Sequence, residues 1–306
     1  QSFDNQQYLD LSYQHSIAES WNLTVRTSYD QARLQAPTPF STGLPDGSIA
    51  IDTYSLRGGW WDSEAKVSGT VLENHTITLG TEITDNLRQD QGNYISLGNV
   101  FSPAPASSSI WAFYGQDEFA ITHALTLSAG LRYDHYSDFG GTTNPCLGLV
   151  YHLFHPTTLK LLYGTAFRAP APPEIAPDSG PFYDNNLALK PETIRTVEGV
   201  VEQDLGQHFK VSGSVFRNWI DNLISLETNS VDHKLVYLNS GKADATGVEV
   251  ELDGHLANGL QGRASYSYVD AKQPITHQSL NNSPQHLAKL NPVSYTHLTL
   301  PTILRV

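Results

Sequence analysis

Charge, cysteine, methionine and long hydrophobic runs are scarce or absent in this sequence of 306 residues. Only 16% of the residues are charged and 39% are hydrophobic, both below the usual shares for a globular protein. The single cysteine, Cys146, excludes an internal disulfide framework and a zinc site built from cysteines. No apolar run approaches the ~18 residues of a membrane-spanning helix. A helical span is therefore excluded, whereas a membrane barrel, whose signal is spread over many weak segments, is not.

Positive charge is also in short supply. The chain has 18 basic and 31 acidic residues, and its formal net charge is −13. Such a surface repels polynucleotides, so no nucleic acid is expected as a partner. Methionine is absent altogether. Because a natural translation product needs an initiator, we expect a processed N-terminus or a fragment of a longer chain.

Motifs for catalysis and metal binding are missing as well. The sequence contains no H-E-x-x-H, no G-x-S-x-G and no phosphate-binding loop. His152 and His155 have an H-x-x-H spacing, but on a strand and turn the two side chains would face opposite sides. Glu249 and Glu251 would lie about 7 Å apart on one strand face, where solvation in a polar interior explains them better than glycoside cleavage does. We predict no enzyme activity, no cofactor and no metal site.

What the sequence does have is alternation with a period of two. Between residues 125 and 134, leucine, alanine and tyrosine alternate with threonine, serine, glycine, arginine and aspartate. Period two predicts β-strands with one apolar and one polar face. We count about thirteen such segments. A strand of about eleven residues, tilted by ~45°, covers roughly the 25 Å apolar band of an outer-membrane barrel.

The connections between these segments alternate between short and long. Long loops are predicted at residues 35–48, 86–109 and 137–145, and an irregular segment at 221–233. A glycine pair, Gly58–Gly59, predicts a bulge or bend within one very long strand. The short turns are predicted near residues 16–21, 73–75, 121–124, 154–157, 205–208 and 255–258. Short turns at one end and long loops at the other are typical of a transmembrane barrel.

The alternation also assigns the two faces of each strand. Leu131, Tyr133 and Val250 are predicted to meet outer-membrane lipid, whereas Arg132 and Glu249 would face a solvated lumen. Aromatic residues near strand ends suit the interfacial girdles of such a barrel. These aromatic residues are Trp60, Trp61, Trp111, Tyr133, Tyr151, Tyr163, Phe167, Trp219, Tyr266 and Tyr268.

The stretch from residue 159 to 203 carries the most specific motifs. A strand ending in YGTAFRAP is followed by a polar loop and then by LKPE, and NSGKADATGVEVEL follows downstream. This ordered series resembles TonB-dependent outer-membrane receptors over most of residues 110–291. The residues that carry the motifs are Phe167, Arg168, Pro170, Leu189, Lys190, Pro191, Glu192, Gly247 and Glu249.

The resemblance implies active uptake of a scarce, bulky nutrient across the outer membrane of a Gram-negative bacterium. Such nutrients include ferric siderophores, haem, cobalamin and oligosaccharides. It also implies a barrel of about 22 strands, a plug domain inside it, and a TonB box that recruits the energy-coupling complex. This sequence carries no plug and no TonB box, and about thirteen strands cannot close a barrel of that size.

The expected fold class is therefore all-β: an incomplete, transmembrane, antiparallel up-and-down β-barrel. We predict a curled sheet of about twelve to fourteen meandering strands with two unpaired edges, in a monomer. Residues 1–291 would form this partial barrel. Residues 292–306 change in composition and resemble the translated read-through of a sequencing adapter, so we expect them to be a non-native tail.

One outer loop holds the candidate ligand-binding residues. Arg168 lies on the polar face at the loop end of its strand, where it could meet an anionic ligand or a plug carboxylate; a salt bridge to a neighbouring strand is the alternative. Loops of this kind often carry specificity. The other candidates are Phe182, Tyr183, Asp184 and Asn185.

Two other functions stay open at this point. One is a passive porin or a barrel enzyme of the outer membrane; a plug sequence upstream would favour the receptor over it. The other is a soluble, secreted β-protein that binds carbohydrate. In that protein one sheet face of every strand pair would be polar and no hydrophobic outer belt would exist.

Overall fold

The computed structural model describes residues 2–41, 49–95, 100–101, 107–175, 183–256, 259–280 and 283–294. These residues are almost entirely strands, with one short helix, α1 (Pro172–Ile175). The strands are β1 (Phe3–Ala18), β2 (Trp21–Ser41), β3 (Ile49–Val71), β4 (His75–Ile95), β5 (Val100–Phe101), β6 (Ser108–Thr122), β7 (Leu125–Tyr136), β8 (Gly140–Phe154), β9 (Thr157–Arg168), β10 (Tyr183–Asp184), β11 (Glu192–Leu205), β12 (Phe209–Thr228), β13 (Leu235–His255), β14 (Leu260–Lys272) and β15 (His286–Ser294).

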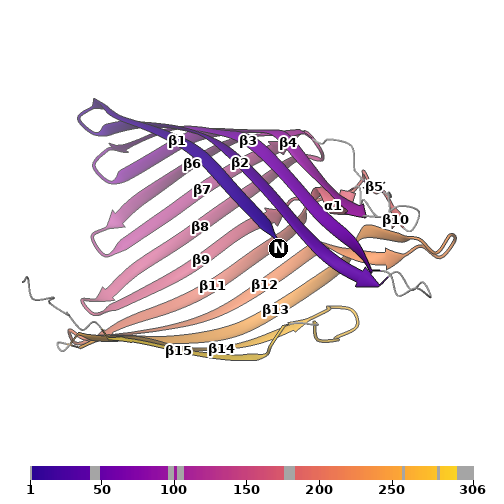
Figure 1. Cartoon of the computed structure of the whole chain (residues 1–306). Coiled ribbons are helices and arrows are strands. Elements are labelled where there is room, and N and C mark those ends of the chain that lie inside the picture. The colour runs from indigo at the N-terminus through magenta and orange to yellow at the C-terminus, as the bar shows by residue number, and fades with distance from the viewer. Residues whose placement is uncertain are drawn as a thin grey trace, which may run out of the picture.

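All of these strands belong to one curved sheet (Figure 1). It has 15 strands in the described residues, and without the two-residue β5 and β10 the 13 long strands follow one another in chain order from β1 to β15. Each long strand pairs antiparallel with the next. Within the part that the structure describes, β1 and β15 do not pair, so the sheet is open. The predicted meander of twelve to fourteen strands with two free edges is confirmed.

Short turns join the strands at one end of the sheet. They occupy residues 19–20, 72–74, 123–124, 155–156 and 206–208, as predicted. The sixth predicted turn, near residues 255–258, lies partly outside the described residues. The opposite end carries α1, β5 and β10 (Figure 1). This asymmetry places residues 169–175 and 183–191 at the long-loop end.

Several predicted loops are shorter than expected. β2 extends to Ser41 and β4 to Ile95, β8 begins at Gly140, and β12 continues to Thr228. The extensions of β2, β4 and β8 are rich in proline, glycine or polar residues, and the register of β12 shifts between Ile220 and Leu223, so the apolar alternation that predicts a strand is lost. Beyond Gln35, β2 no longer pairs with β1, and a strand with a free edge tolerates prolines such as Pro37.

The predicted irregularity at the glycine pair is present, but the extra residue lies in the neighbouring strand. Gly59 pairs with Arg88, whereas Trp60 pairs with Asn86, so Leu87 has no partner opposite it in β3. β4 therefore carries the bulge. A Cβ on Gly59 would lie 4.0 Å from Cβ of Arg88, whereas a Cβ on Gly58 would lie 3.2 Å from the ring of Trp60, so Gly58 gives that ring room.

The large apolar side chains of this sheet point outward. Leu131, Val215 and Val250 are 53%, 60% and 51% exposed. The buried hydrophobic residues of the described part are alanines and one larger residue, Leu189. A water-soluble sheet would cover such a face with another layer, so the outer face requires an apolar environment.

The other face of the sheet is polar and concave. Arg132 forms ion pairs with Glu82 at 2.5 Å and with Asp134 at 2.8 Å, and the hydroxyl of Tyr114 donates a hydrogen bond to Glu64. These residues come from four adjacent strands, β3, β4, β6 and β7. The predicted assignment of Arg132 to the polar face is therefore confirmed.

One aromatic residue departs from the predicted girdle. Trp60 pairs with Asp30 across β2 and β3 and lines a hollow with Arg26, Asp62 and Glu64 on the polar face. Strand parity requires this, because Trp61 beside it points outward against Tyr29, with ring centroids 4.9 Å apart. Trp60 therefore belongs to the interior.

Candidate functional site

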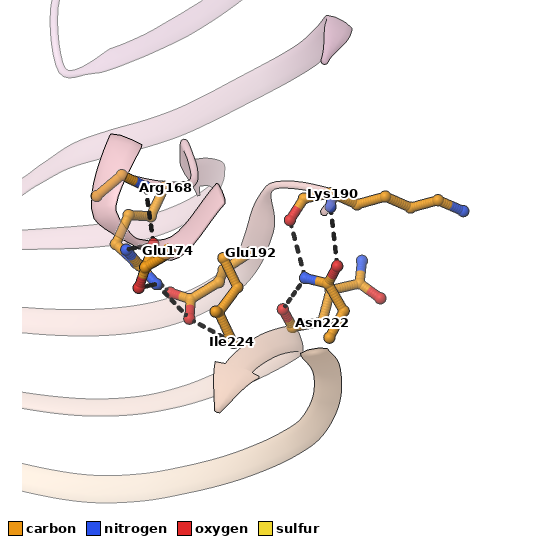
Figure 2. A network of polar contacts seen from close by, with 8 residues as sticks. Arg168, Glu174, Lys190, Glu192, Asn222 and Ile224 are labelled. Atoms are coloured by element: carbon orange, nitrogen blue, oxygen red, sulfur yellow. Dashed lines mark hydrogen bonds and ion pairs between the residues drawn. The ribbon is translucent and has the colours of Figure 1, made fainter. Parts of the chain in front are cut away.

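The candidate site lies at the long-loop end of β9 and β11, where the most specific sequence motifs converge. Arg168 ends β9, Glu192 begins β11, and the two residues are direct cross-strand partners. The guanidinium donates from Nε to Oε2 of Glu192 at 2.6 Å and from Nη2 to Oε1 at 2.8 Å. This two-point pairing fixes the orientation of the guanidinium plane (Figure 2).

A second carboxylate occupies the remaining side of Arg168. Glu174 in α1 accepts from Nη1 at 3.0 Å and from Nη2 at 3.1 Å. The same carboxylate also accepts from the backbone N–H of Ala171 at 2.7 Å, so it caps the first turn of α1. The salt bridge that was the alternative interpretation of Arg168 is thus present. These bonds use four of the five N–H groups of the guanidinium, so within the described residues one N–H of Nη1 is left for another partner.

Glu192 extends the network to a third strand. Its Oε1 accepts the backbone N–H of Ile224 in β12 at 2.8 Å. Both carboxylates are largely shielded, with Glu174 17% and Glu192 14% exposed, whereas Arg168 is 46% exposed. Through Glu192, one arginine therefore links the ends of β9 and β11, the helix α1 and β12 near its long-loop end.

Asn239 of β13 holds the LKPE segment in place. It accepts from the backbone N–H of Lys190 and donates to the carbonyl of Lys190, both at 2.8 Å, and it donates to the carbonyl of Asn222 at 2.8 Å. Asn222 has a positive φ of 59°, at the point where the β12–β13 register shifts. The Lys190 side chain extends away from this cluster (Figure 2), so the motif acts here through its backbone.

Burial and close packing explain two other motif residues, Leu189 and Gly247. Leu189 is the largest buried apolar side chain of the described residues, at 4% exposure. A Cβ on Gly247 would lie 2.5 Å from Cζ of Phe216 and 2.8 Å from the carbonyl oxygen of Tyr268. Glycine is therefore required for the close packing of β12, β13 and β14 at that point. Glu249 lies two residues further along the same, inward face.

Two of the predicted loop residues gather around a hollow of about 640 Å³. Asp184 and Asn185 line it together with residues of β12, β13 and the turn between them. β10 places them there by pairing in parallel with β13, with Tyr183 opposite Leu235. Tyr183 is half-buried, and Phe182 lies outside the described residues. The remaining lining residues are Asn186, Thr228, Asn229, Ser230, Val236 and Leu238.

Lys234 beside this hollow was not predicted. Its ammonium group lies 2.7 Å from Asp184, and this hydrogen bond raises the pKa of Lys234. Residues 229–234 form the turn between β12 and β13, and most of them belong to the longer irregular segment predicted at residues 221–233. The turn-forming pair Asn229–Ser230 is the signal that could have separated strand from turn.

Arg168 and Asp184 belong to separate clusters in the structure, and α1 links the two. The carbonyl of Ile175 at the end of α1 accepts the backbone N–H of Asn186 at 2.9 Å, and Asn186 lines the hollow.

In the described residues no cluster of histidine, cysteine, aspartate and glutamate could hold a metal ion. No helix of the described part is long and apolar enough to span a membrane.

The comparisons with known proteins identify the family. The family model described as "TonB dependent receptor-like, beta-barrel" matches residues 1–303. The chain belongs to the TonB-dependent receptor family. The resemblance noted in the sequence motifs is thus confirmed.

Individual relatives agree with this assignment. The chain is 26% identical to the ferric enterobactin receptor of Pseudomonas aeruginosa over 87% of its own length and 42% of that protein. A crystal structure of a G324V mutant of the P. aeruginosa ferric enterobactin receptor matches with a TM-score of 0.75 at 21% identity, over 93% of this chain and 46% of that one. The copper transporter OprC matches with a TM-score of 0.73 at 14% identity, over 94% and 50%. The chain spans about half the length of these relatives or less.

The last strand reaches into the segment predicted to be a non-native tail. β15 continues through residues 292–294, the first three of that segment, which pair with Gly262, Gln261 and Leu260 of β14. Residues 295–306 lie outside the described residues. The assignment of 292–306 as non-native stays a prediction.

Proposed function

We propose that this chain forms part of the wall of an outer-membrane receptor that imports a bulky, scarce nutrient with energy supplied through TonB. The observation that carries the proposal is the family match over residues 1–303, together with the outward apolar face of the open sheet. The receptor would reside in the outer membrane of a Gram-negative bacterium as a monomer. Its relatives are receptors and transporters by name, which supports import without catalysis.

A ferric siderophore is the proposed substrate class. The curated relative is a ferric enterobactin receptor, which supports a ferric chelate as cargo. The name of the copper transporter indicates that the same fold accommodates other cargo, so fold alone does not select the substrate. Tyr183, Asp184 and Asn185 are the proposed ligand-facing residues, since they come from an outer loop and two of them line the hollow.

The network around Arg168 has a positioning role in this proposal. By holding α1 against the ends of β9 and β11, it fixes both ends of residues 169–191, the segment that carries the ligand-facing residues. Anchoring a binding loop at both ends lowers the conformational entropy lost when a ligand binds. Arg168 would then act on affinity through loop order and not through direct contact.

Uptake measurements test the proposal. A strain lacking the gene would be supplied with a panel of radiolabelled ferric siderophores, with and without the complete gene restored. We expect restored uptake of at least one chelate, and loss of that uptake when a protonophore collapses the inner-membrane gradient. Uptake that persists with the protonophore would instead indicate a passive pore. Absence of uptake for the whole panel would contradict the siderophore assignment.

A further inference from the structure

A cationic hollow lies on the outward face of β1–β4, away from the network and the hollow described above. It encloses about 340 Å³, and none of its lining residues is acidic. Three arginines, Arg33 of β2, Arg57 of β3 and Arg88 of β4, supply its charge. The other lining residues are Phe3, Asn5, Gln7, Gln31, Ala32 and Gly58.

Two of these arginines oppose each other directly. Arg33 and Arg57 are cross-strand partners in the β2–β3 ladder, where like charges repel and destabilise the pair. Asp90 lies opposite Arg57 in β4, but its carboxylate is ion-paired with Arg88. Within the described residues neither Arg33 nor Arg57 forms an ion pair; Arg33 contacts the ring of Phe3, at 5.9 Å from the centroid. Three arginines and one carboxylate leave an excess of positive charge.

The other outward arginines of the described residues each have an acid partner. Arg195 of β11 pairs with Asp221 at 3.0 Å and shares it with Lys242 at 2.9 Å, and Arg217 of β12 pairs with Asp244 at 3.2 Å. Within the described residues, Arg33 and Arg57 are therefore the outward arginines that have no acid partner. An arrangement that is unfavourable in the isolated chain is favourable once an anion lies between the two guanidinium groups.

The position of the hollow along the bilayer normal indicates which anion would lie beside it. Tyr29 and Trp61 face each other on the outward side of the same two strands, as aromatic residues of an interfacial girdle do. Arg33 lies four residues beyond Tyr29 toward the long loops, about 13 Å along the strand or about 9 Å along the normal for a tilt of ~45°. The headgroup layer extends about 5–8 Å beyond the hydrocarbon on each side of a bilayer. The backbone at Arg33 thus lies about 1–4 Å beyond this layer, a distance that a long arginine side chain can span, so its guanidinium group can meet a lipid phosphate.

We propose that Arg33 and Arg57 bind the phosphate of an anionic lipid in the leaflet at the long-loop end. The exposed ring of Phe3 and the polar amides of Asn5, Gln7 and Gln31 line the remaining wall of the hollow. The inference rests on the proposed membrane location, but it is independent of the imported substrate. The lipid is a lateral partner of the barrel wall and not its cargo.

Native mass spectrometry of the complete receptor, released from nanodiscs, tests this site. The probes are phosphatidic acid and diacylglycerol with the same acyl chains, which differ only in the phosphate. We expect the receptor to retain phosphatidic acid and not diacylglycerol. The double variant Arg33→Gln/Arg57→Gln should retain phosphatidic acid on the order of tenfold more weakly, since each arginine near an anionic surface strengthens binding severalfold.

The matched control is Arg195→Gln/Arg217→Gln, which removes the same charge from the same face. It should retain phosphatidic acid like the unaltered receptor, because its two arginines already have acid partners. The variant Arg33→Lys/Arg57→Lys keeps the charge and should regain most of the binding. Without added lipid, the unfolding temperature of Arg33→Gln/Arg57→Gln should not be lower than that of the unaltered receptor, because the variant removes a like-charge pair.

If Arg33→Gln/Arg57→Gln and Arg195→Gln/Arg217→Gln both retain phosphatidic acid as well as the unaltered receptor does, the inference is overturned. The proposed function would stay intact, because uptake of the ferric chelate is a separate readout. Equal losses in the two variants would also overturn it, since general surface charge would then explain binding. Failure of every form to enter nanodiscs would overturn the membrane location and this inference together.

Discussion

Val250 and Glu251 are neighbours in β13, yet they meet opposite surroundings. Val250 pairs with Gly213 and Tyr266 on the outer face, where large apolar side chains are exposed across the whole sheet. Glu251 pairs with Ser212 and Ser265 on the inner face, among polar and charged groups. With no packed core between two layers, each face must be stabilised by what lies against it. The outer face depends on lipid, and the inner face on ion pairs and hydrogen bonds.

A charge placed on the outer face should have the largest effect. Val250→Arg is expected to lower the free energy of unfolding by about 2–4 kcal/mol if this position is near the bilayer centre. Urea unfolding of the complete receptor in lipid vesicles measures the loss. The matched change Glu251→Arg on the inner face should cost much less, and equal losses at both positions would remove the distinction between the faces.

Close packing on the inner face is tested at Gly247. In Gly247→Ala the new methyl would overlap Phe216 and the backbone of Tyr268, so a loss of about 1–3 kcal/mol is expected. Thermal unfolding followed by circular dichroism reports it. Gly164→Ala is the control, because no neighbouring atom lies within 4 Å of the position that its methyl group would take. It should stay within about 0.5 kcal/mol of the unaltered protein.

Hydrogen bonding at the rim is tested at Asn239. Asn239→Ala removes three hydrogen bonds to the Lys190 and Asn222 backbones, with an expected loss of about 1–2 kcal/mol. Hydrogen exchange at the Lys190 amide should accelerate. Asn144→Ala removes only weak contacts, of 3.3 and 3.5 Å, and should leave exchange at Lys190 unchanged. Unchanged protection in Asn239→Ala would show that the LKPE segment is held by other contacts.

The smallest effect is expected for the Arg168–Glu174 pair. Because Arg168 is half-exposed, solvent screens the pair, and Glu174→Gln should cost about 0.5–1 kcal/mol. A double-mutant cycle with Arg168→Gln isolates the interaction, which should shrink as salt is added. A coupling free energy of zero at low salt would mean that the ion pair does not hold α1 in place.

The membrane-crossing parts of the strands could be predicted because one of their faces must be apolar. That requirement produces the period of two, and it correctly located the five short turns at one end of the sheet, at residues 19–20, 72–74, 123–124, 155–156 and 206–208. Beyond the membrane, no face of a strand has to be apolar. The end of β2 carries prolines, the end of β4 is mostly polar, and the register of β12 shifts between Ile220 and Leu223, so loops were predicted there instead of strands.

The candidate site was predictable only in part, for a related reason. Arg168 and Glu192 stand out because they occupy motifs at two strand ends. Glu174, Asn239 and Ile224 come from a short helix and two other strands, so only the register of the folded sheet brings them together. Alternation fixes the face of a residue but not its height relative to distant strands.

The contact between the outer face and lipid is the central claim, and spin labelling along β13 tests it most directly. With Cys146→Ser as background, single cysteines at Val248, Glu249, Val250, Glu251 and Leu252 would carry a nitroxide in the complete receptor in bilayers. Accessibility to oxygen, which concentrates in lipid, should be high at Val248, Val250 and Leu252 and low at Glu249 and Glu251. Uniform accessibility along the five positions, or the opposite alternation, would contradict lipid contact by the outer face.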